Sequence, residues 1–403
     1  MNVIKKNRIK KVVFITPSFP HQNGKGYEKV LFYRIKYLKQ FAEVSVLISP
    51  RMLSSVSHKR NFEEDGINYV VFPPSVIDLL FAGIKIASGK SIINSLYFNR
   101  RMLSQLKSLQ ENEETLLFYC TSRIAHSLNK MSSVVVVDFI DSMHLNFKRR
   151  SIAENLNIFK KFWNYEAERA RMHDNEVARY SRISFCVSSI DSEIIESSNV
   201  FTIPLGVDVR EDRARSEKEN AIVFSGNLNY HPNVLAIKWF LENCWNLILA
   251  EVPTALFNIV GRGASVNTIK YLAGFKNVNL VGAVDDMYDE LENNCISVAP
   301  MVSGSGMQNK ILEAMAVGLP VLTTNIGLGD IAARNNEEIL IADEISNFVA
   351  ACLRLLNDSN ARLGLGERGR DFVQKHHSWA SVNERLKSSF SQANIELSPN
   401  GKN

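Results

Sequence analysis

Short apolar runs alternate with longer amphipathic stretches along most of the chain. The first run, residues 12–16, is rich in Val, Ile and Phe, and residues 27–41 then show the spacing of an amphipathic helix. Alternation of strands and helices predicts a parallel sheet that helices cover on both faces, which is an α/β fold. The other predicted strands are 44–48, 69–72, 116–119, 134–137, 184–187, 221–225, 256–260, 278–280, 296–299, 321–324 and 339–341.

One segment interrupts this alternation. Residues 207–220 contain almost no side chain that a protein core would bury, so we interpret them as a linker between domains. We therefore predict an N-terminal α/β domain over residues 1–206 and a C-terminal α/β domain over residues 221–379. The polar residues 393–403 are predicted to form a disordered tail.

Composition narrows the class of protein. The chain has 403 residues, of which 45% are hydrophobic and 22% are charged, and this excludes a wholly disordered protein. Its five cysteines are far apart and mostly lie within apolar runs, which favours reduced thiols in a cytoplasmic protein over disulfides or a metal site. No window holds eighteen uncharged apolar residues, so we expect no membrane-spanning helix.

Charge is distributed unevenly along the chain. Residues 1–210 hold 30 basic and 20 acidic side chains, whereas residues 211–403 hold 17 and 22. A basic half favours an anionic partner such as a membrane surface or a phosphorylated substrate, and an ordinary solvated surface is the alternative. The sequence lacks a basic platform with interleaved aromatic residues, so we expect no nucleic-acid site.

The segment 299–324 carries the most chemistry. A predicted strand ends near residue 299, a glycine-containing loop follows, and a helix begins close to Met307 and ends at Gly318. Loop amides and the N–H groups of the first helical turn can bind an anion, and Lys310 adds a positive charge. Glu313 can accept hydrogen bonds from ribose hydroxyls. The alternative is a tight turn for close packing beside a surface Lys310–Glu313 pair.

The run EAMAVGLPV at residues 313–321 resembles the nucleotide-sugar signature of the family-4 glycosyltransferases. This resemblance implies the GT-B fold, an α/β fold in which two Rossmann-like domains face each other across a cleft. It implies that the C-terminal domain binds the sugar donor, that the N-terminal domain binds the acceptor, and that a helix at about 380–392 packs back on the N-terminal domain. In this sequence Ser305 stands where the family has its first Glu, which contacts the donor sugar.

Further segments resemble the same family: the strand and glycine loop at 12–26, the glycine turn at 225–227, and the VGRG run at 260–263. The resemblance implies these donor-binding residues: Gly24, Gly26, Ser225, Gly226, Asn227, Gly261, Arg262, Ser303, Gly304, Ser305, Gly306, Met307, Gln308, Lys310 and Glu313. No Lys or Arg follows within the glycine-turn segment 226–233, so the phosphate charge would be balanced by Arg262, Lys310 and loop amides.

Two aspartates stand where family members commonly have a histidine, after a central strand of the first domain. The resemblance implies that Asp138 or Asp141 binds sugar hydroxyls or guides the acceptor hydroxyl, and that Lys310 acts on the departing diphosphate. The alternative for Asp141 is a helix cap. His144 is another polar candidate, although a lone histidine near aromatic residues more often has a structural role.

The resemblance therefore predicts that the protein is a retaining hexosyltransferase of bacterial surface-polysaccharide or exopolysaccharide synthesis. It would transfer sugar from a UDP- or GDP-sugar to a hydroxyl of a glycan or lipid-linked glycan, without cofactor or metal. We expect it in the cytoplasm, as a peripheral protein at the inner face of the cell membrane, where anionic lipid attracts Lys and Arg. The alternatives are a catalytically inactive glycosyltransferase-like binding subunit and a GT-B nucleotide-sugar epimerase.

Overall fold

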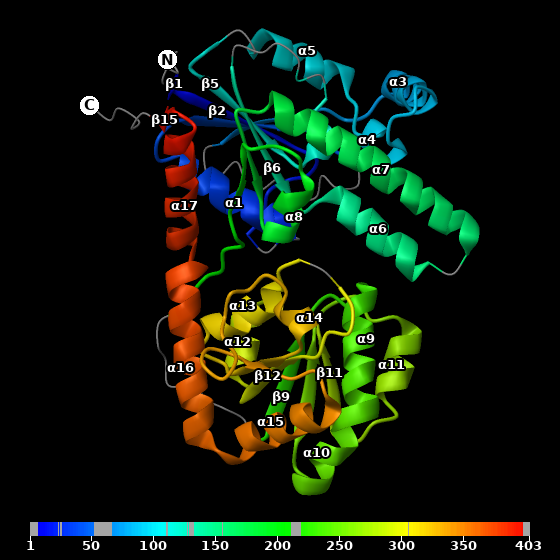
Figure 1. Ribbon diagram of the computed structural model, residues 1–403, viewed down its shortest axis with the longest axis vertical. Helices are drawn as coiled ribbons and strands as arrows, with labels where there is room; N and C mark the ends of the chain where they lie inside the picture. Colours follow the sequence, from blue (N-terminus) through cyan, green and yellow to red (C-terminus); the bar gives the residue numbers. More distant parts are fainter. Residues whose placement is uncertain are drawn as a thin grey trace. The chain divides into compact units, whose positions relative to one another are not determined.

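The structure is a computed structural model that describes residues 7–22, 24, 26–51, 67–109, 112–126, 128, 133–154, 156–210, 219–304 and 306–397. It divides into two compact units (Figure 1). Unit 1 comprises Met1–Pro204 and Asn383–Asn403, and unit 2 comprises Leu205–Val382. The predicted domains ended at residues 206 and 379, close to these boundaries.

Unit 1 is built on a seven-stranded parallel sheet with the strand order β4-β3-β2-β5-β6-β7-β8. The strands are β2 (Lys11–Thr16), β3 (Glu43–Ile48), β4 (Asn68–Val71), β5 (Thr115–Cys120), β6 (Val134–Ile140), β7 (Ile183–Cys186) and β8 (Val200–Thr202). The helices are α1 (Gly26–Leu38), α3 (Val76–Ala87), α4 (Ile92–Ser95), α5 (Arg100–Leu109), η2 (Ser122–Ile124), α6 (Met143–Ala153), α7 (Asn157–Tyr180) and α8 (Ser189–Ile194). Strands β5 and β6 are buried at every position, as expected where helices cover both faces of a parallel sheet.

Unit 2 is built on a six-stranded parallel sheet with the order β11-β10-β9-β12-β13-β14. The strands are β9 (Ala221–Ser225), β10 (Leu256–Val260), β11 (Val278–Gly282), β12 (Ile296–Ala299), β13 (Val321–Thr323) and β14 (Leu340–Ile341). The helices are α9 (His231–Phe240), η3 (Leu241–Trp245), α10 (Asn246–Glu251), α11 (Val266–Leu272), α12 (Met287–Glu292), α13 (Asn309–Ala316), α14 (Asn325–Leu328), α15 (Ile345–Asn357) and α16 (Ser359–His376). Its core includes the fully buried rings of Phe240, Trp245, Phe257 and Phe348.

Both sheets are doubly wound. In each of these two sheets the first strand, β2 or β9, lies in the interior, and the chain adds two strands on one side before it continues on the other. At the point where the strand order reverses, the loops that follow the two neighbouring strands run in opposite directions. Ligands of such sheets bind at the carboxyl ends of these two strands. These switch points lie between β2 and β5 in unit 1 and between β9 and β12 in unit 2. Each predicted strand overlaps one of these strands.

The C-terminal segment differs from the prediction. Helix α17 (Trp379–Gln392) continues the chain from unit 2 into unit 1, and β15 (Ile395–Leu397) then pairs in parallel with β1 (Asn7–Ile9). The predicted disordered tail at 393–403 is therefore wrong for residues 395–397, while 398–403 lie outside the described residues. The buried side chain of Ile395 and the backbone pairing of β15 with β1 stabilise residues 395–397.

The predicted linker is also partly ordered. Val207 is buried and forms a bridge with Ser378, and the Arg210 guanidinium pairs with the carboxylates of Asp286 and Asp289. These contacts attach the first residues of the predicted linker 207–220 to unit 2, whereas residues 211–218 lie outside the described part. None of the helices in the described part of the chain has the length and apolar sequence to cross a bilayer.

Candidate active site

The predicted donor-binding residues of the C-terminal half gather at the switch point of unit 2. Ser225 ends β9 and Gly226 follows it, while Ser303 and Gly304 lie in the loop after β12. Helix α13 begins directly after this loop, so its N-terminal turn lies at the same edge of the sheet. This arrangement brings together residues that are up to about eighty positions apart in the sequence.

The loops after β9 and β10 approach each other through their backbones. The Gly226 N–H donates to the Val260 carbonyl at 2.9 Å, and the Gly261 N–H donates to the Gly282 carbonyl at 2.7 Å. A Cβ atom on Gly261 would lie 1.8 Å from the Gly226 carbonyl oxygen, so no side chain fits there. Glycine at both positions therefore permits backbone to form this part of the site.

Lys310 is the central charged group. It lies in the first turn of α13, it is only 8% exposed, and its Nζ donates a hydrogen bond to Asn233 Oδ1. Nζ also lies 4.7 Å from the centroid of the Phe224 ring and 3.4 Å from Met301 Sδ. Burial lowers the pKa of Lys310 to about 7, and the charge of Glu313 on the same helix acts in the opposite direction.

Asn233 holds Lys310 in place. Its Nδ2 donates to the Asn227 carbonyl at 2.9 Å, which leaves its Oδ1 to accept from Lys310. Asn233 follows Pro232 in the first turn of α9, where proline is favoured. The sequence prediction missed Asn233 because its partner lies seventy-seven positions away. The only local signal was a polar residue in the first turn of a helix that follows a glycine turn.

Several buried polar atoms near Lys310 have no hydrogen-bond partner among the described residues. They are Ser225 Oγ, Ser303 Oγ and Asn309 Oδ1. In addition, the side chain of Gln308, the N-cap residue of α13, forms no capping hydrogen bond, so the first N–H groups of this helix are not satisfied in that way. Native proteins rarely leave such groups unpaired unless water or a ligand binds them. An anionic ligand that also carries hydroxyl groups matches this set of donors and acceptors.

The loop after β12 is fixed from behind by the loop after β13. Thr324 Oγ1 donates to the Met301 carbonyl at 2.6 Å, and a Cβ on Gly327 would lie 2.2 Å from Thr323 Oγ1. Gly304 and Gly306 adopt φ values of 125° and 71°, which residues other than glycine rarely adopt. The contacts of Thr323 and Thr324 were not predicted, although two polar residues at the end of the predicted strand 321–324 were a signal.

The remaining predicted residues of unit 2 are placed less centrally. Arg262 is exposed, and its carbonyl accepts from the Leu228 N–H at 2.8 Å. Glu313 is half-buried on α13, and Asn227 Oδ1 accepts from the Asn229 N–H. Met307 and Gln308 lie directly before α13, whereas Ser305 lies outside the described residues. Gly318 has the positive φ of 67° expected of the residue that ends this helix.

In unit 1, β6 ends irregularly at the carboxyl edge of the sheet. The pairing of β6 with β7 shifts between Asp138 and Ile140, and Ile140 has a φ of 65°. Thr121, directly after the neighbouring β5, has a φ of 73°. Positive φ is unfavourable for a β-branched residue, and such strain is concentrated at functional sites. The two adjacent strands therefore end in strained backbone on either side of Asp138.

The two aspartates of β6 have different surroundings. The Asp138 side chain is buried, with its Oδ2 3.6 Å from Nε of the buried Arg34, and its Oδ1 accepts from the Ile140 N–H. Burial raises the pKa of Asp138, and the charge of Arg34 opposes that rise. Asp138 therefore forms an internal ion pair. The sequence did not indicate this, because Arg34 lies on α1.

Asp141 lies just beyond the end of β6 and is half-buried. Burial, assisted by the charge of Asp191, raises the pKa of Asp141 to about 6, while Arg149 and Arg123 act in the opposite direction. Asp141 does not cap α6, because that role belongs to Ser142, whose Oγ accepts from the Leu145 N–H. The helix-cap alternative for Asp141 is therefore wrong.

Two further predicted features of unit 1 can be placed. Gly26 begins α1, and a Cβ on Gly24 would lie 2.8 Å from Glu28 Cβ, so the glycine loop folds tightly against α1. Ser18 Oγ, in the same loop, donates to Glu28 Oε1 of α1 at 2.9 Å. His144 Nδ1 lies 3.0 Å from the Ala167 carbonyl, which agrees with a structural role.

Comparison with known proteins identifies the domain that carries the Lys310 site. Residues 219–358 match the family model described as Glycosyl transferases group 1. Unit 2 carries a group 1 glycosyltransferase domain. The glycine turn after β9, the loop after β12 and all of α13 lie within the matched residues.

Relatives and solved structures extend the comparison to the whole chain. An "Uncharacterized 44.6 kDa protein in cps region" of Klebsiella pneumoniae is 21% identical over 91% of this chain and 96% of its own length. An Escherichia coli UDP-Gal:alpha-D-GlcNAc-diphosphoundecaprenol alpha-1,3-galactosyltransferase is 28% identical over 43% of this chain and 51% of its own length. The crystal structure of Anabaena Alr3699/HepE in complex with UDP and glucose is 12% identical and has a TM-score of 0.64 over 94% of this chain and 99% of that chain. The chain has the GT-B fold, with two Rossmann-like units.

Proposed function

We propose that the protein transfers a sugar from a UDP- or GDP-sugar to a hydroxyl group of a glycan or lipid-linked glycan, with retention of configuration. The observation that carries the proposal is the buried Lys310–Asn233 pair at the switch point of a group 1 glycosyltransferase domain. Around it, Ser225 Oγ, Ser303 Oγ and Asn309 Oδ1 have no partner among the described residues. A nucleoside diphosphate offers the charge and the hydroxyl groups that this set lacks.

The chemical task is to stabilise the departing diphosphate. In a retaining transfer the acceptor oxygen forms a bond to the anomeric carbon while the bond from that carbon to the phosphate oxygen breaks. The acceptor proton moves to the departing phosphate. Lys310, the first N–H groups of α13 and the amides of the loop after β12 would stabilise the negative charge that develops there. We propose that these groups act without a metal ion or cofactor.

Unit 1 would bind the acceptor through the carboxyl edge of its sheet. Asp141 is the side chain best suited to accept a hydrogen bond from a sugar hydroxyl, because its carboxyl is half-buried and is ionised above a pKa of about 6. Asp138 acts indirectly in this proposal, since its ion pair with Arg34 supports the strained end of β6. Asp138 is a positioning residue.

The proposed setting is bacterial surface-polysaccharide synthesis at the inner face of the cell membrane. Two relatives support it, because one is described by its cps region and the other by a diphosphoundecaprenol-linked acceptor. A basic N-terminal half, with 30 Lys and Arg against 20 Asp and Glu in residues 1–210, agrees with an acceptor or surface that carries phosphate.

A donor-turnover assay tests this proposal. The protein is incubated with UDP- and GDP-hexoses and with lipid-linked acceptors, and the release of nucleoside diphosphate and the sugar product are measured. We expect release with one donor, its loss in Lys310→Ala, and no change in Lys270→Ala, which alters an exposed lysine of α11. Donor binding without any release would indicate an inactive binding subunit. Conversion of the donor sugar without release of the diphosphate would indicate an epimerase.

A further inference from the structure

Helix α3 of unit 1 presents an unusually apolar surface to solvent. Six large apolar side chains of this twelve-residue helix are exposed, with Val76 at 75% and Leu80 at 64% of their full exposure. The exposed set, here called the α3 surface, is Val76, Ile77, Leu79, Leu80, Phe81 and Ile84. A helix that is apolar on most sides is normally buried in a core or a membrane.

Polar contacts and one aromatic stack attach α3 to the unit. Its buried side chains are Asp78 and Ala82. The carboxylate of Asp78 accepts from Ser75 Oγ at 2.6 Å, from the Ser75 N–H and from the Arg100 N–H. Of the exposed apolar side chains, Phe81 stacks on the Phe98 ring with 5.8 Å between centroids and lies beneath the Arg100 guanidinium, while the others remain available for another partner.

A polar cavity of about 170 Å³ opens beside the end of α3. His126 Nε2 and both side-chain polar atoms of Asn94 are buried and have no hydrogen-bond partner among the described residues. These two side chains are 6% and 3% exposed and line the cavity. Unpaired buried donors and acceptors of this kind indicate a polar ligand or ordered water.

The charges around the cavity favour an anion. Lys85, the cation of α3, lines it together with Lys90, and Lys90 pairs with Glu176 at 3.1 Å. Lys85 has no carboxylate partner within ion-pair distance in the described part of the chain, and its Nζ lies over the Phe98 ring. The nearby carboxylate of Glu166 is buried and is satisfied by Ser91 Oγ and two backbone N–H groups. One positive charge is thus left for a ligand.

A second element of unit 1 combines exposed apolar groups with positive charge. At the turn between α6 and α7, Ile152, Leu156, Ile158 and Phe159 are exposed, at 78%, 59%, 72% and 49%. This set is called the α6–α7 tip. Residues 148–161 around it contain five Lys or Arg and one Glu.

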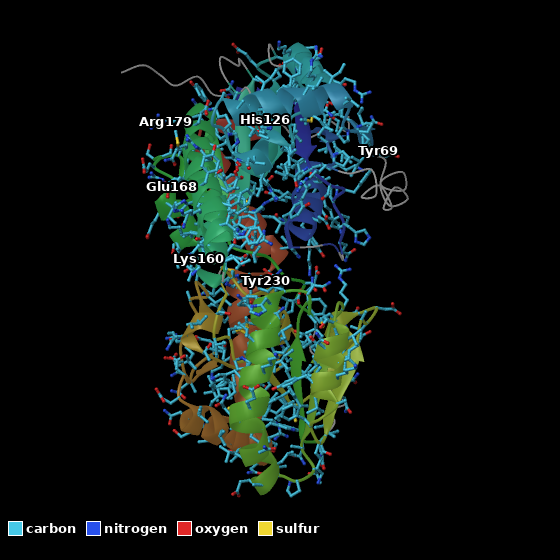
Figure 2. All side chains as sticks on the ribbon, turned by 90° about the vertical axis from the view of Figure 1, so that its right-hand side faces the viewer. Tyr69, His126, Lys160, Glu168, Arg179 and Tyr230 are labelled. Carbon is cyan, nitrogen blue, oxygen red and sulfur yellow. The ribbon has the colours of Figure 1, made fainter. Side chains whose placement is uncertain are left out.

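Both elements lie on one side of unit 1. In Figure 1, α3 and the α6–α7 tip are at the right-hand side of the unit, and Figure 2 turns that side toward the viewer, with Lys160 of α7 labelled. Exposed apolar side chains that are bordered by Lys and Arg form the pattern that binds the surface of an anionic bilayer. A neutral apolar protein partner would not require the surrounding positive charge.

We propose that unit 1 binds an anionic lipid bilayer through the α3 surface and the α6–α7 tip, and that the cavity lined by Lys85, Asn94 and His126 holds a lipid phosphate group. Apolar side chains enter the interface of the bilayer, while Lys85 and Lys90 contact the phosphate beside α3. This proposal rests on the proposed function in one respect, which is that a lipid-linked acceptor lies at a membrane. It goes further by naming the surface and the lipid group.

Vesicle sedimentation without nucleotide tests the proposal. The full chain is mixed with vesicles of phosphatidylcholine alone and with vesicles that also contain phosphatidylglycerol, and binding is measured over a range of salt concentration. We expect binding to the anionic vesicles that weakens with salt, and little binding to the neutral ones. The double variant Ile77→Ser/Leu80→Ser should bind at least about tenfold more weakly, because two apolar groups no longer leave water.

The cavity has its own variant and the surface has a matched control. Lys85→Gln/Lys90→Gln should lower vesicle binding by about twenty-five-fold, since each cation near an anionic bilayer contributes about fivefold. Val266→Ser/Ile269→Ser removes apolar side chains of α11 that are 68% and 46% exposed in unit 2, and it should bind as the unaltered chain does. Melting curves of all variants establish that each is folded.

Several outcomes would overturn the proposal. Equal binding to neutral and anionic vesicles, or unchanged binding of the α3 variant, excludes the membrane surface. Unchanged binding of the Lys85/Lys90 variant excludes the phosphate site. If the chain does not bind vesicles but forms dimers that Ile77→Ser/Leu80→Ser dissociates, a second copy covers α3. Lys310→Ala should sediment as the unaltered chain does, so failure of donor binding and failure of membrane binding are distinguished.

Discussion

The carboxyl edges of the two sheets differ in how their charged and polar groups are paired. At the switch point of unit 2, glycine backbones touch, Lys310 is buried beside Asn233, and Ser225 and Ser303 keep polar atoms without partners in the described structure. In unit 1, by contrast, Asp138 already pairs with Arg34. In the proposed function, the edge with unpaired groups binds the diphosphate of the donor. The edge whose charges pair with each other would present one carboxylate, Asp141, to the acceptor.

The largest expected effect concerns the carboxyl edge of unit 1, where Asp138 pairs with Arg34. Asp138→Asn removes the negative charge that faces the buried Arg34 guanidinium, and breaking a buried ion pair costs about 3–5 kcal/mol of unfolding free energy. We expect the melting temperature of unit 1 to fall by roughly 10 °C. Calorimetry measures this change. A stable Asp138→Asn protein that has lost only activity would contradict the assignment of Asp138 as a positioning residue.

At the carboxyl edge of unit 2, by contrast, substitution of the buried charged group should lower activity but raise stability. Lys310→Met should lower kcat/KM by about 10²–10³, as for other groups that stabilise charge in a transition state. The ligand-free protein should become more stable, by about 1–4 kcal/mol, because a buried ammonium is removed. Turnover assays and melting curves test both parts, with Lys270→Met as the exposed control. A loss of activity together with a loss of stability would point to a structural lysine.

The pH dependence of this effect has a defined sign. The pKa of Lys310 is about 7 in the folded chain and 10.5 in its ordinary state, so the unfolded chain binds more protons between these values. The stability advantage of Lys310→Met is therefore full below pH 7 and disappears as the pH rises toward 10. Nucleotide binding stabilises the charged amine, so the unaltered chain should take up protons on binding above pH 7. Calorimetry in two buffers of different ionisation enthalpy measures this uptake.

Asp141→Asn should separate activity from stability at the edge of unit 1. We expect kcat/KM to fall about a hundredfold if Asp141 contacts the reacting sugars. Because the folded pKa of Asp141 is about 6, above its ordinary 3.8, its charge destabilises the fold at neutral pH, and the Asn variant should be more stable by about 1–3 kcal/mol. That difference should shrink as the pH falls from 6 toward 4. Unchanged activity would remove Asp141 from the site.

The smallest effect tests the close approach of backbone in unit 2. Gly226→Ala would place a Cβ atom 2.7 Å from Asn233 Nδ2, so Asn233 must move and its hold on Lys310 weakens. We expect the KM for the donor to rise about tenfold with little change in kcat. Gly274→Ala is the matched control, because its new Cβ would lie 3.4 Å from the nearest atom, the Tyr271 carbonyl oxygen. Equal effects of the two substitutions would contradict this reading.

The sequence predicted the elements better than the contacts between them. Apolar runs located the strands of both sheets, and the positive φ of Gly318 confirms the predicted end of α13, because both signals are local. The Lys310–Asn233 bond joins residues seventy-seven positions apart, and no local pattern indicates it. The ion pair of Asp138 with Arg34 likewise joins two elements that are far apart in the sequence, and no local pattern indicates the register shift at the end of β6. The short strand β15 depends on pairing with β1 across almost the whole chain.

The central claim is that the switch point between β9 and β12 binds a nucleoside diphosphate through Lys310. Melting curves of the unaltered chain and Lys310→Ala with UDP, GDP and ADP test it most directly. A ligand at about one hundred times its dissociation constant adds about 2.7 kcal/mol to the unfolding free energy. We predict that one nucleotide raises the melting temperature of the unaltered chain and that Lys310→Ala largely removes this shift. An equal shift in both proteins, or no shift with any nucleotide, would contradict the claim.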